Sequence, residues 1–301
     1  MKPSAIPARP SAVRARCADL GLQPSRRRGQ NFLADANWIA KVLRVAELPA
    51  DRPVVEIGPG LGALTAGLLA AGKEVYAIES DGRLIRWLEE TLARDDPEHL
   101  HLLAGDAVEH PQAGAPPSGE RALLSNLPFA ITSPWLDALL TSSAPLPDPL
   151  VLILQEEGAA RLRSSPGRNE YGPSAIRAQL AYEAGASHAV PAAAFEPRPG
   201  VPSRLLRWSL RRAPRLLAPA EVRLLRSLFL HRRKTLASAL RRELPATLRA
   251  SWEEHLRAAG YDDRARPAEI GPEDWWELFR RARDHRFPDC RSTPPEPSSP
   301  A

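Results

Sequence analysis

Cysteine is nearly absent from this sequence of 301 residues, which contains only Cys17 and Cys290, near its two ends. They form no CxxC pair, so we expect neither a metal-binding cysteine cluster nor a disulfide framework, and a reducing compartment is favoured. No apolar run approaches the roughly 18 residues that a transmembrane helix needs, and the N-terminus lacks the apolar core of a secretory signal. These absences predict a cytoplasmic globular protein with no bound metal and no membrane association.

Positive charge is concentrated in two segments, although the whole sequence has a net charge of only +5. Residues 1–30 carry seven Lys or Arg and one acid, and residues 204–242 carry twelve and one. Residues 31–203 are acidic, with thirteen basic and twenty-two acidic residues. The first segment fits a basic arm or, less commonly, a transit peptide. The second has more positive charge than solubility requires, so we expect a polyanionic partner, most simply a nucleic acid.

Short apolar runs alternate with helical patterns up to about residue 210. Five of these runs predict strands, at 53–57, 74–79, 100–104, 122–126 and 150–155. Helical patterns lie between them at 63–71, 83–93 and 133–140. Apolar strands separated by helices indicate a parallel sheet that is covered on both faces. Two further strands are expected at 187–190 and 204–210.

After Arg211 the pattern becomes helical, with predicted helices at 221–242, 246–259 and 272–283. The sequence therefore predicts an α/β domain followed by a small helical domain. The last residues contain no apolar group that could be buried and are expected to be disordered. The predicted regions are a basic arm over 1–28, an α/β domain over 29–210, a helical domain over 211–288 and a tail over 289–301.

Glycines and polar side chains follow consecutive predicted strands. The first strand ends in EIGPGLG, where Gly58 and Gly60 allow a tight turn and a close approach to a ligand. Glu79 ends the second strand and could accept hydrogen bonds from ribose hydroxyls. Asp106 follows the third, where it could accept from an adenine amino group, and Asn126 ends the fourth. Because carboxyl ends of parallel strands share one edge, the set predicts a site for an adenosine-containing cofactor.

Several such cofactors are poorly matched by this sequence. The glycine spacing is G-x-G-x-G, not the dinucleotide pattern, and there is no Walker lysine, metal-ligand cluster or plausible hydride-transfer residue. The remaining common choice is S-adenosyl-L-methionine, whose methyl group is already activated, so that the protein mainly supplies position and charge complementarity.

The stretch SNLPFAITSP places an amide, a proline and an aromatic ring at the end of a buried strand. Its local sequence alone fits an ordinary strand-to-helix turn. The whole chain favours a functional interpretation, because eight motifs over roughly residues 20 to 283 resemble the ribosomal RNA adenine N6-dimethyltransferase family of the kasugamycin-sensitivity type. In order, these motifs are RRRGQNFLAD, EIGPGLGALT, AIES, AGDA, SNLPFAITSP, NEYGPSAIRAQ, FEPRPGVPS and RRKTLASAL.

The resemblance implies a Rossmann-like class I S-adenosylmethionine-dependent methyltransferase domain with a small C-terminal helical domain. The implied reaction is the N6-dimethylation of two adjacent adenines in small-subunit (16S-type) ribosomal RNA during ribosome assembly. The partner would be that RNA within the pre-small-subunit particle, and the enzyme would act as a monomer. Two alternatives stay open: a large-subunit methyltransferase of the macrolide-resistance type, and a non-catalytic RNA-binding, assembly or organelle transcription factor.

The resemblance also implies which residues hold the cofactor. Glu79 would bind the ribose and Asp106 the adenine. The implied cofactor-binding set is Asn31, Leu33, Gly58, Gly60, Glu79, Asp106 and Asn126.

Catalysis is implied for the four residues that match the family's NLP-aromatic motif, Asn126, Leu127, Pro128 and Phe129. Phe129 would stack on an adenine extruded from its helix. The Asn126 side-chain oxygen and the Leu127 carbonyl would accept hydrogen bonds from the adenine amino group, and Pro128 would fix the backbone.

RNA contacts are implied at two further places. Phe195 would lie on the other side of the extruded base, although it could instead be a core residue. Arg232, Arg233 and Lys234, expected on the first C-terminal helix, would contact phosphates, although they could simply form a solvated helical face.

Overall fold

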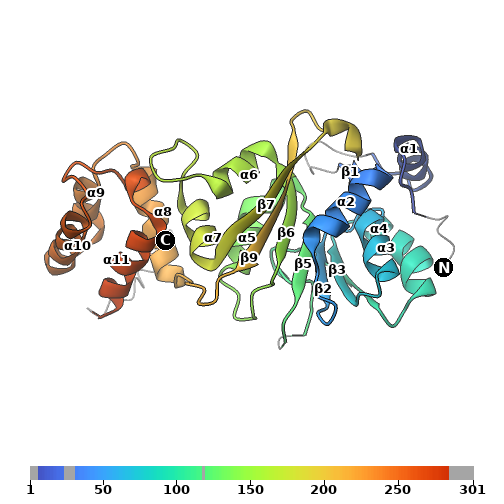
Figure 1. Cartoon of the computed structure of the whole chain (residues 1–301), viewed down its shortest axis with the longest axis horizontal. Helices are drawn as coiled ribbons and strands as arrows, with labels where there is room; N and C mark the ends of the chain where they lie inside the picture. The colour runs from blue at the N-terminus through green and yellow to red at the C-terminus, as the bar shows by residue number, and fades with distance from the viewer. Residues whose placement is uncertain (1–5, 24–30, 117–118, 285–301) are drawn as a thin grey trace, which may run out of the picture. The chain divides into compact units, whose positions relative to one another are not determined.

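The computed structural model describes residues 6–23, 31–116 and 119–284 (Figure 1). These residues form two compact units. The first contains the described residues within 1–164 and 174–216, and the second those within 165–173 and 217–301. The sequence suggested a boundary after residue 210 and did not assign 165–173 to the helical part.

The first unit is built on a seven-stranded sheet in the order β4-β3-β2-β5-β6-β9-β7. Five strands are parallel, and β9 is antiparallel to both of its neighbours. The strands are β2 (Val54–Ile57), β3 (Val75–Glu79), β4 (Leu100–Ala104), β5 (Ala122–Asn126), β6 (Leu150–Gln155), β7 (Tyr182–Val190) and β9 (Ser203–Leu210). All seven strands expected from the sequence are present, although β7 begins five residues earlier than predicted.

Helices cover both faces of this sheet, as the apolar strands predicted. Alternate strand residues belong to different cores: Val54 and Val75 pack with α1 to α4, whereas Val55 and Ile78 pack with α5 to α7. The helices are α1 (Pro10–Asp19), α2 (Ala36–Ala46), α3 (Ala63–Ala70), α4 (Gly82–Leu88), a π-helical turn (Glu89–Ala93), α5 (Thr132–Leu139), α6 (Glu156–Arg163) and α7 (Pro173–Ala181). Within the described ranges, no helix is both long enough and apolar enough to cross a bilayer.

A second, two-stranded sheet fastens the N-terminal segment to the first unit. In it, β1 (Phe32–Leu33) pairs antiparallel with β8 (Phe195–Glu196), next to a short 3-10 turn at Ala192–Ala194. Arg14 of α1 forms an ion pair of 2.7 Å with Glu196 of β8. The N-terminal arm expected over 1–28 thus contains a helix that packs on the core, with Val13 and Cys17 buried. Neither this two-stranded sheet nor α1 was predicted from the sequence.

The two central strands β2 and β5 separate at their carboxyl ends. They pair only at Val54–Ala122 and Val55–Leu123, whereas β3 and β4 stay paired as far as Glu79. The buried Ser125 hydroxyl bridges the gap by donating to the Ile57 carbonyl at 2.6 Å. Strand order reverses here, which is where open α/β sheets bind ligands.

The second unit is helical and contains α8 (Pro219–Leu230), α9 (Leu236–Glu243), α10 (Ala246–Ala258), a 3-10 turn (Pro267–Glu269) and α11 (Pro272–Asp284). The single helix predicted over 221–242 is wrong, because α8 ends at Leu230 and α9 restarts with Thr235 as its N-cap, accepting from Ser238 N. The core is aromatic: Trp252 packs edge-on against Trp275 and Phe279, with ring centroids 6.4 and 5.5 Å apart.

We predict that Trp252→Ala lowers the free energy of unfolding by about 3–5 kcal/mol, because it removes a fully buried ring from this core. Trp252→Phe keeps an aromatic ring and removes an indole N–H that has no partner among the described residues, so it should cost less than half as much. Urea unfolding and hydrogen exchange at the amides of α10 and α11 would measure both. Equal losses in the two variants would contradict this account of the core.

Candidate active site

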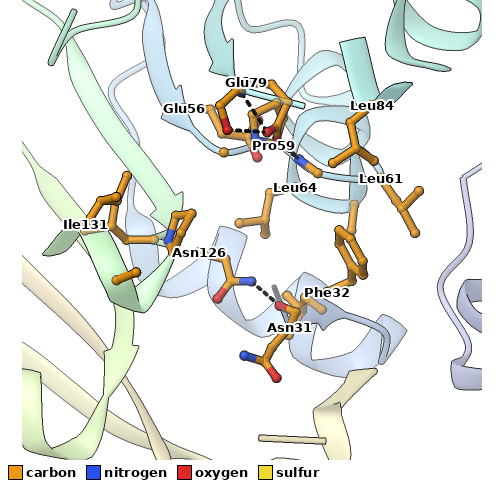
Figure 2. Close-up of a pocket in the computed structure, with 18 residues that line it drawn as sticks. Asn31, Phe32, Glu56, Pro59, Leu61, Leu64, Glu79, Leu84, Asn126 and Ile131 are labelled. Carbon is orange, nitrogen blue, oxygen red and sulfur yellow. Dashed lines mark hydrogen bonds between the residues drawn. The ribbon is translucent and has the colours of Figure 1, made fainter. Parts of the chain in front are cut away.

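A cavity of about 500 Å³ lies at the carboxyl ends of β2, β3 and β5, where β2 and β5 separate (Figure 2). Its volume falls within the roughly 300–1,000 Å³ typical of cofactor sites. It is lined mainly by four segments, residues 31–33, 58–61, 79–80 and 126–128. The sequence had predicted this edge, and each of these segments contains residues expected to bind the cofactor.

The glycine turn after β2 is packed against two of the other segments. Gly58 and Gly60 both have left-handed backbone angles, with φ values of 66° and 59°. A Cβ on Gly60 would lie 2.9 Å from the Phe32 ring, and one on Gly58 would lie 3.0 Å from Pro128. A side chain at either position would therefore push away a neighbouring wall of the cavity.

Glu79 presents a buried carboxylate at the end of β3. Its two oxygens accept hydrogen bonds from the backbone N–H groups of Gly60 (3.2 Å), Ser80 (2.8 Å) and Asp81 (3.0 Å). Burial raises the pKa of Glu79, and these three hydrogen bonds oppose that rise. The site thus holds a well-anchored acceptor where the sequence predicted a ribose contact.

Glu56 is a second buried acid in the cavity wall, and sequence reasoning gave it no role. It is 1% exposed and accepts a hydrogen bond of 2.7 Å from the Thr65 hydroxyl. Burial raises the pKa of Glu56 to about 8; the Thr65 hydrogen bond lowers it and the nearby Glu79 charge adds to the rise. The feature of the sequence that could have drawn attention to Glu56 is its position as a carboxylate inside the apolar run VVEI. Figure 2 shows Glu56 and Glu79 on the same side of the cavity.

Asn126 is held in one orientation by the N-terminal segment. Its Nδ2 donates a hydrogen bond of 2.8 Å to the backbone carbonyl of Asn31 (Figure 2). Because a carbonyl only accepts, the amide nitrogen must face Asn31, and Oδ1 has no hydrogen-bond partner among the described residues. The next residues continue into a 3-10 turn, Phe129–Ile131. The Phe129 side chain lies outside what the structure describes.

Three other expected site residues or segments do not line this cavity. Asp106 follows β4, is exposed and accepts from Val108 N at 2.8 Å, but it does not line the cavity. Phe195, in β8, is fully buried in the core, as its alternative interpretation as a core residue predicted. The basic residues 232–234 are exposed but lie in the turn between α8 and α9, not on a helix.

Within the described ranges, no three His, Cys, Asp or Glu side chains gather in a way that could hold a metal ion. The polar groups of the cavity are instead carboxylates, an amide and backbone N–H groups. Carboxylates are suited to accept hydrogen bonds from ribose hydroxyls and to face a cation, and S-adenosylmethionine has both of these features.

The buried Glu56 predicts a specific dependence of stability on pH. Its folded pKa of about 8 lies above the ordinary value of 4.5, so the folded state binds the proton more tightly than the unfolded state. The free energy of unfolding should therefore fall as pH rises from about 4.5 to about 8. Glu56→Gln mimics the neutral acid and can still accept from Thr65, so it should flatten this slope and be more stable than the wild type at pH 8.5, by roughly 1–3 kcal/mol.

Urea unfolding of both proteins between pH 5.5 and 8.5 would measure the difference. If the free energies of unfolding of the two proteins changed in parallel with pH, with no relative gain for Glu56→Gln at high pH, Glu56 would be ionised in the folded protein.

Comparison with known proteins agrees with this geometry. The ribosomal RNA adenine dimethylase family matches residues 22–281. A protein of Opitutus terrae called ribosomal RNA small subunit methyltransferase A is 45% identical over 275 residues, which cover 91% of this chain and 98% of the relative. A protein of the same name from Moorella thermoacetica is 39% identical over 288 residues, 91% and 97% of the two chains.

Two solved structures are also similar. The 23S rRNA methyltransferase ErmE has a TM-score of 0.60 and 28% identity, covering 83% of this chain and 99% of its own. A dimethyladenosine transferase from Plasmodium falciparum has a TM-score of 0.68 and 21% identity, covering 84% and 97%, which supports the fold. The Rossmann-like methyltransferase fold and the resemblance drawn from the eight motifs are both confirmed: the chain belongs to the ribosomal RNA adenine dimethylase family.

Proposed function

We propose that this protein transfers methyl groups from S-adenosylmethionine to the N6 atoms of two adjacent adenines in small-subunit ribosomal RNA during ribosome assembly. The observation that carries the proposal is the position of Asn126, whose carboxamide is fixed at the wall of a cofactor-sized cavity. The names of the curated relatives support the small subunit as the substrate.

The cofactor site is assigned to groups that line the cavity and to Asp106, which follows the neighbouring strand β4. Asn31, Leu33, Gly58 and Gly60 would surround the cofactor, and Glu79 would accept hydrogen bonds from its ribose hydroxyls. Asp106, at the end of the neighbouring strand β4, would contact the adenine. S-adenosylmethionine supplies an electrophilic methyl group on a sulfonium ion.

The protein's own contribution is to make the adenine nitrogen nucleophilic. The N6 lone pair of adenine is delocalised into its ring. Asn126 Oδ1 and the Leu127 carbonyl would accept the hydrogens of the amino group, which favours a pyramidal nitrogen with a directed lone pair. The same oxygens stabilise positive charge that develops on N6. Pro128 has no N–H that could compete for these acceptors.

The adenine must leave its helical stack before it can reach Asn126, at a cost of a few kcal/mol. We assign the compensating stacking contact to Phe129, worth about 1–3 kcal/mol for a base on an aromatic ring. After the first transfer the nitrogen still carries one hydrogen, so the same acceptors can direct the second methylation.

RNA binding outside the pocket is assigned to the helical region 211–288 and to the basic arm 1–28. Arg232, Arg233 and Lys234 are all exposed. Their charges are suited to phosphate contacts, which position an RNA without reading its sequence. The protein would act in the cytoplasm as a monomer.

A second candidate function is the methylation of large-subunit RNA. It is favoured by one observation, the 28% identity to the 23S rRNA methyltransferase ErmE over nearly the whole of that chain.

Methylation with labelled S-adenosylmethionine would decide between them. Undermodified small subunits, large subunits and naked RNA would be compared, followed by nucleoside mass spectrometry. We expect N6-dimethyladenine in small subunits only. Label in large-subunit RNA would support the second candidate, and tight particle binding without methyl transfer would contradict both.

The Asn126–Asn31 hydrogen bond predicts that activity needs a side-chain amide at position 126, and that a side chain with acceptor oxygens alone does not suffice. Asn126→Ala removes the acceptor and should lower kcat about 10²–10³-fold, by analogy with the loss of one transition-state hydrogen bond. Asn126→Asp keeps two acceptor oxygens but cannot donate to the Asn31 carbonyl at 2.8 Å, so it should lose activity to a similar extent.

The matched control is Asn37→Asp, an exposed residue of α2, which should leave kcat within about twofold. Single-turnover methylation rates and cofactor affinity would be measured for all three variants. If Asn126→Asp keeps more than half of the wild-type rate, the Asn31 carbonyl does not orient the amide.

A further inference from the structure

A second pocket lies beside the catalytic turn, at the same edge of the sheet as the cofactor cavity. It has a volume of about 120 Å³ and lies between α5 and α6. Ala130 and Ile131 line the cofactor cavity, and the next two residues, Thr132 and Ser133, line the second one. The strands that lead into the two helices, β5 and β6, are hydrogen-bonded neighbours. We call this second cavity the flanking pocket.

The size of the flanking pocket limits what it can hold. Sites for free cofactors and small molecules usually have volumes of roughly 300–1,000 Å³. This pocket is well below that range. It is therefore suited to a single ring system of a larger ligand that is held mainly by a neighbouring site.

The lining offers hydrogen bonds that the protein does not use itself. Thr132, Ser133 and Gln155 face the pocket, and their side chains have no hydrogen-bond partner among the residues that the structure describes. Two hydroxyls and one carboxamide supply both donors and acceptors, which is what the edge of an unpaired nucleobase requires. Leu136 and Leu162 add apolar surface for the face of a ring.

Arg161 places a cation at the same pocket. Its guanidinium donates to the Glu157 carboxylate at 2.9 Å, and the two side chains are 45% and 77% exposed. Such an exposed pair one helical turn apart contributes little to stability. The guanidinium can therefore exchange this partner for a phosphate, to which it can donate two hydrogen bonds.

Gly158 lines the pocket and contributes no side chain to it. It lies inside α6, where glycine costs roughly 0.5–1 kcal/mol relative to alanine. Its backbone has no positive φ, and a Cβ built there would meet no atom within 4 Å. Neither backbone conformation nor packing therefore requires glycine at this position, whereas a side chain would reduce the volume of the pocket.

We propose that the flanking pocket binds the nucleotide next to the target adenosine in the RNA strand. Thr132, Ser133 and Gln155 would contact its base, and Arg161 would contact its phosphate. The pocket would thereby select the sequence beside the methylated position and orient the strand. This inference rests on the proposed function, because the strand is held there only if its neighbour enters the methyl-transfer site.

Arg161 and Arg163 give a matched pair of variants. Both are exposed arginines of α6, but only Arg161 lines the pocket. With undermodified small subunits as substrate, Arg161→Ala should raise KM for the particle about tenfold, as expected for a lost charge-assisted hydrogen bond. Arg163→Ala should stay within about twofold, and the affinity for S-adenosylmethionine should be unchanged in both.

Gly158→Leu tests the pocket without removing a charge. Leucine is a better helix former than glycine, so the thermal midpoint should not fall. The added side chain should lower kcat/KM for the particle about tenfold while cofactor affinity stays at the wild-type value. A loss of activity together with a lower midpoint or weaker cofactor binding would overturn the pocket as the cause.

Two failures are distinguishable. A wild-type protein that makes no N6-dimethyladenine on any substrate contradicts the proposed function, and the flanking pocket with it. An active wild type whose Arg161→Ala and Arg163→Ala variants behave alike, with Gly158→Leu also unaffected, overturns the flanking pocket alone.

Discussion

The hydrogen bond between the Asn126 side chain and the Asn31 carbonyl is the contact on which the candidate site depends. It joins two segments that are 95 residues apart in the sequence. The Asn31 carbonyl is in turn placed by the pairing of β1 with β8, and β5 is held at the separated strand ends by the Ser125–Ile57 hydrogen bond. The orientation of one amide is thus fixed by three pairs of segments that are distant in the chain.

The same region explains why the glycine turn cannot carry side chains. Phe32 approaches Gly60 from the N-terminal segment, and Pro128 approaches Gly58 from the segment that follows β5. Close packing leaves no room for a Cβ, so a change in any of the three segments displaces the other two. In the proposed function, cofactor binding and methyl transfer would therefore be coupled through contact between the walls of a single cavity.

The central sheet was predictable because its strands are continuous apolar runs with helices between them, and Leu100–Ala104 and Leu150–Gln155 were placed to the residue. The β1–β8 pair was not, since strands of two residues have no periodicity and depend on a partner far along the chain. Side-chain direction was also beyond the sequence: the Phe195 ring could face either an RNA base or the core, and only the structure shows that it is buried in the core. Strand-end residues were assigned by position alone, which selected Glu79 but overlooked Glu56, because Glu56 lies one residue before the end of its strand.

The two buried acids show how stability and binding oppose each other in this cavity. Burial raises the pKa of both Glu56 and Glu79, so removing their protons costs free energy in the folded protein. A cation bound beside them lowers this cost, because it favours the ionised forms by direct attraction. Binding of a positively charged ligand should therefore release protons and increase in strength as pH rises towards 8. Where they are ionised, the acids destabilise the ligand-free fold, and by the same electrostatics they would favour a cationic ligand over a neutral one.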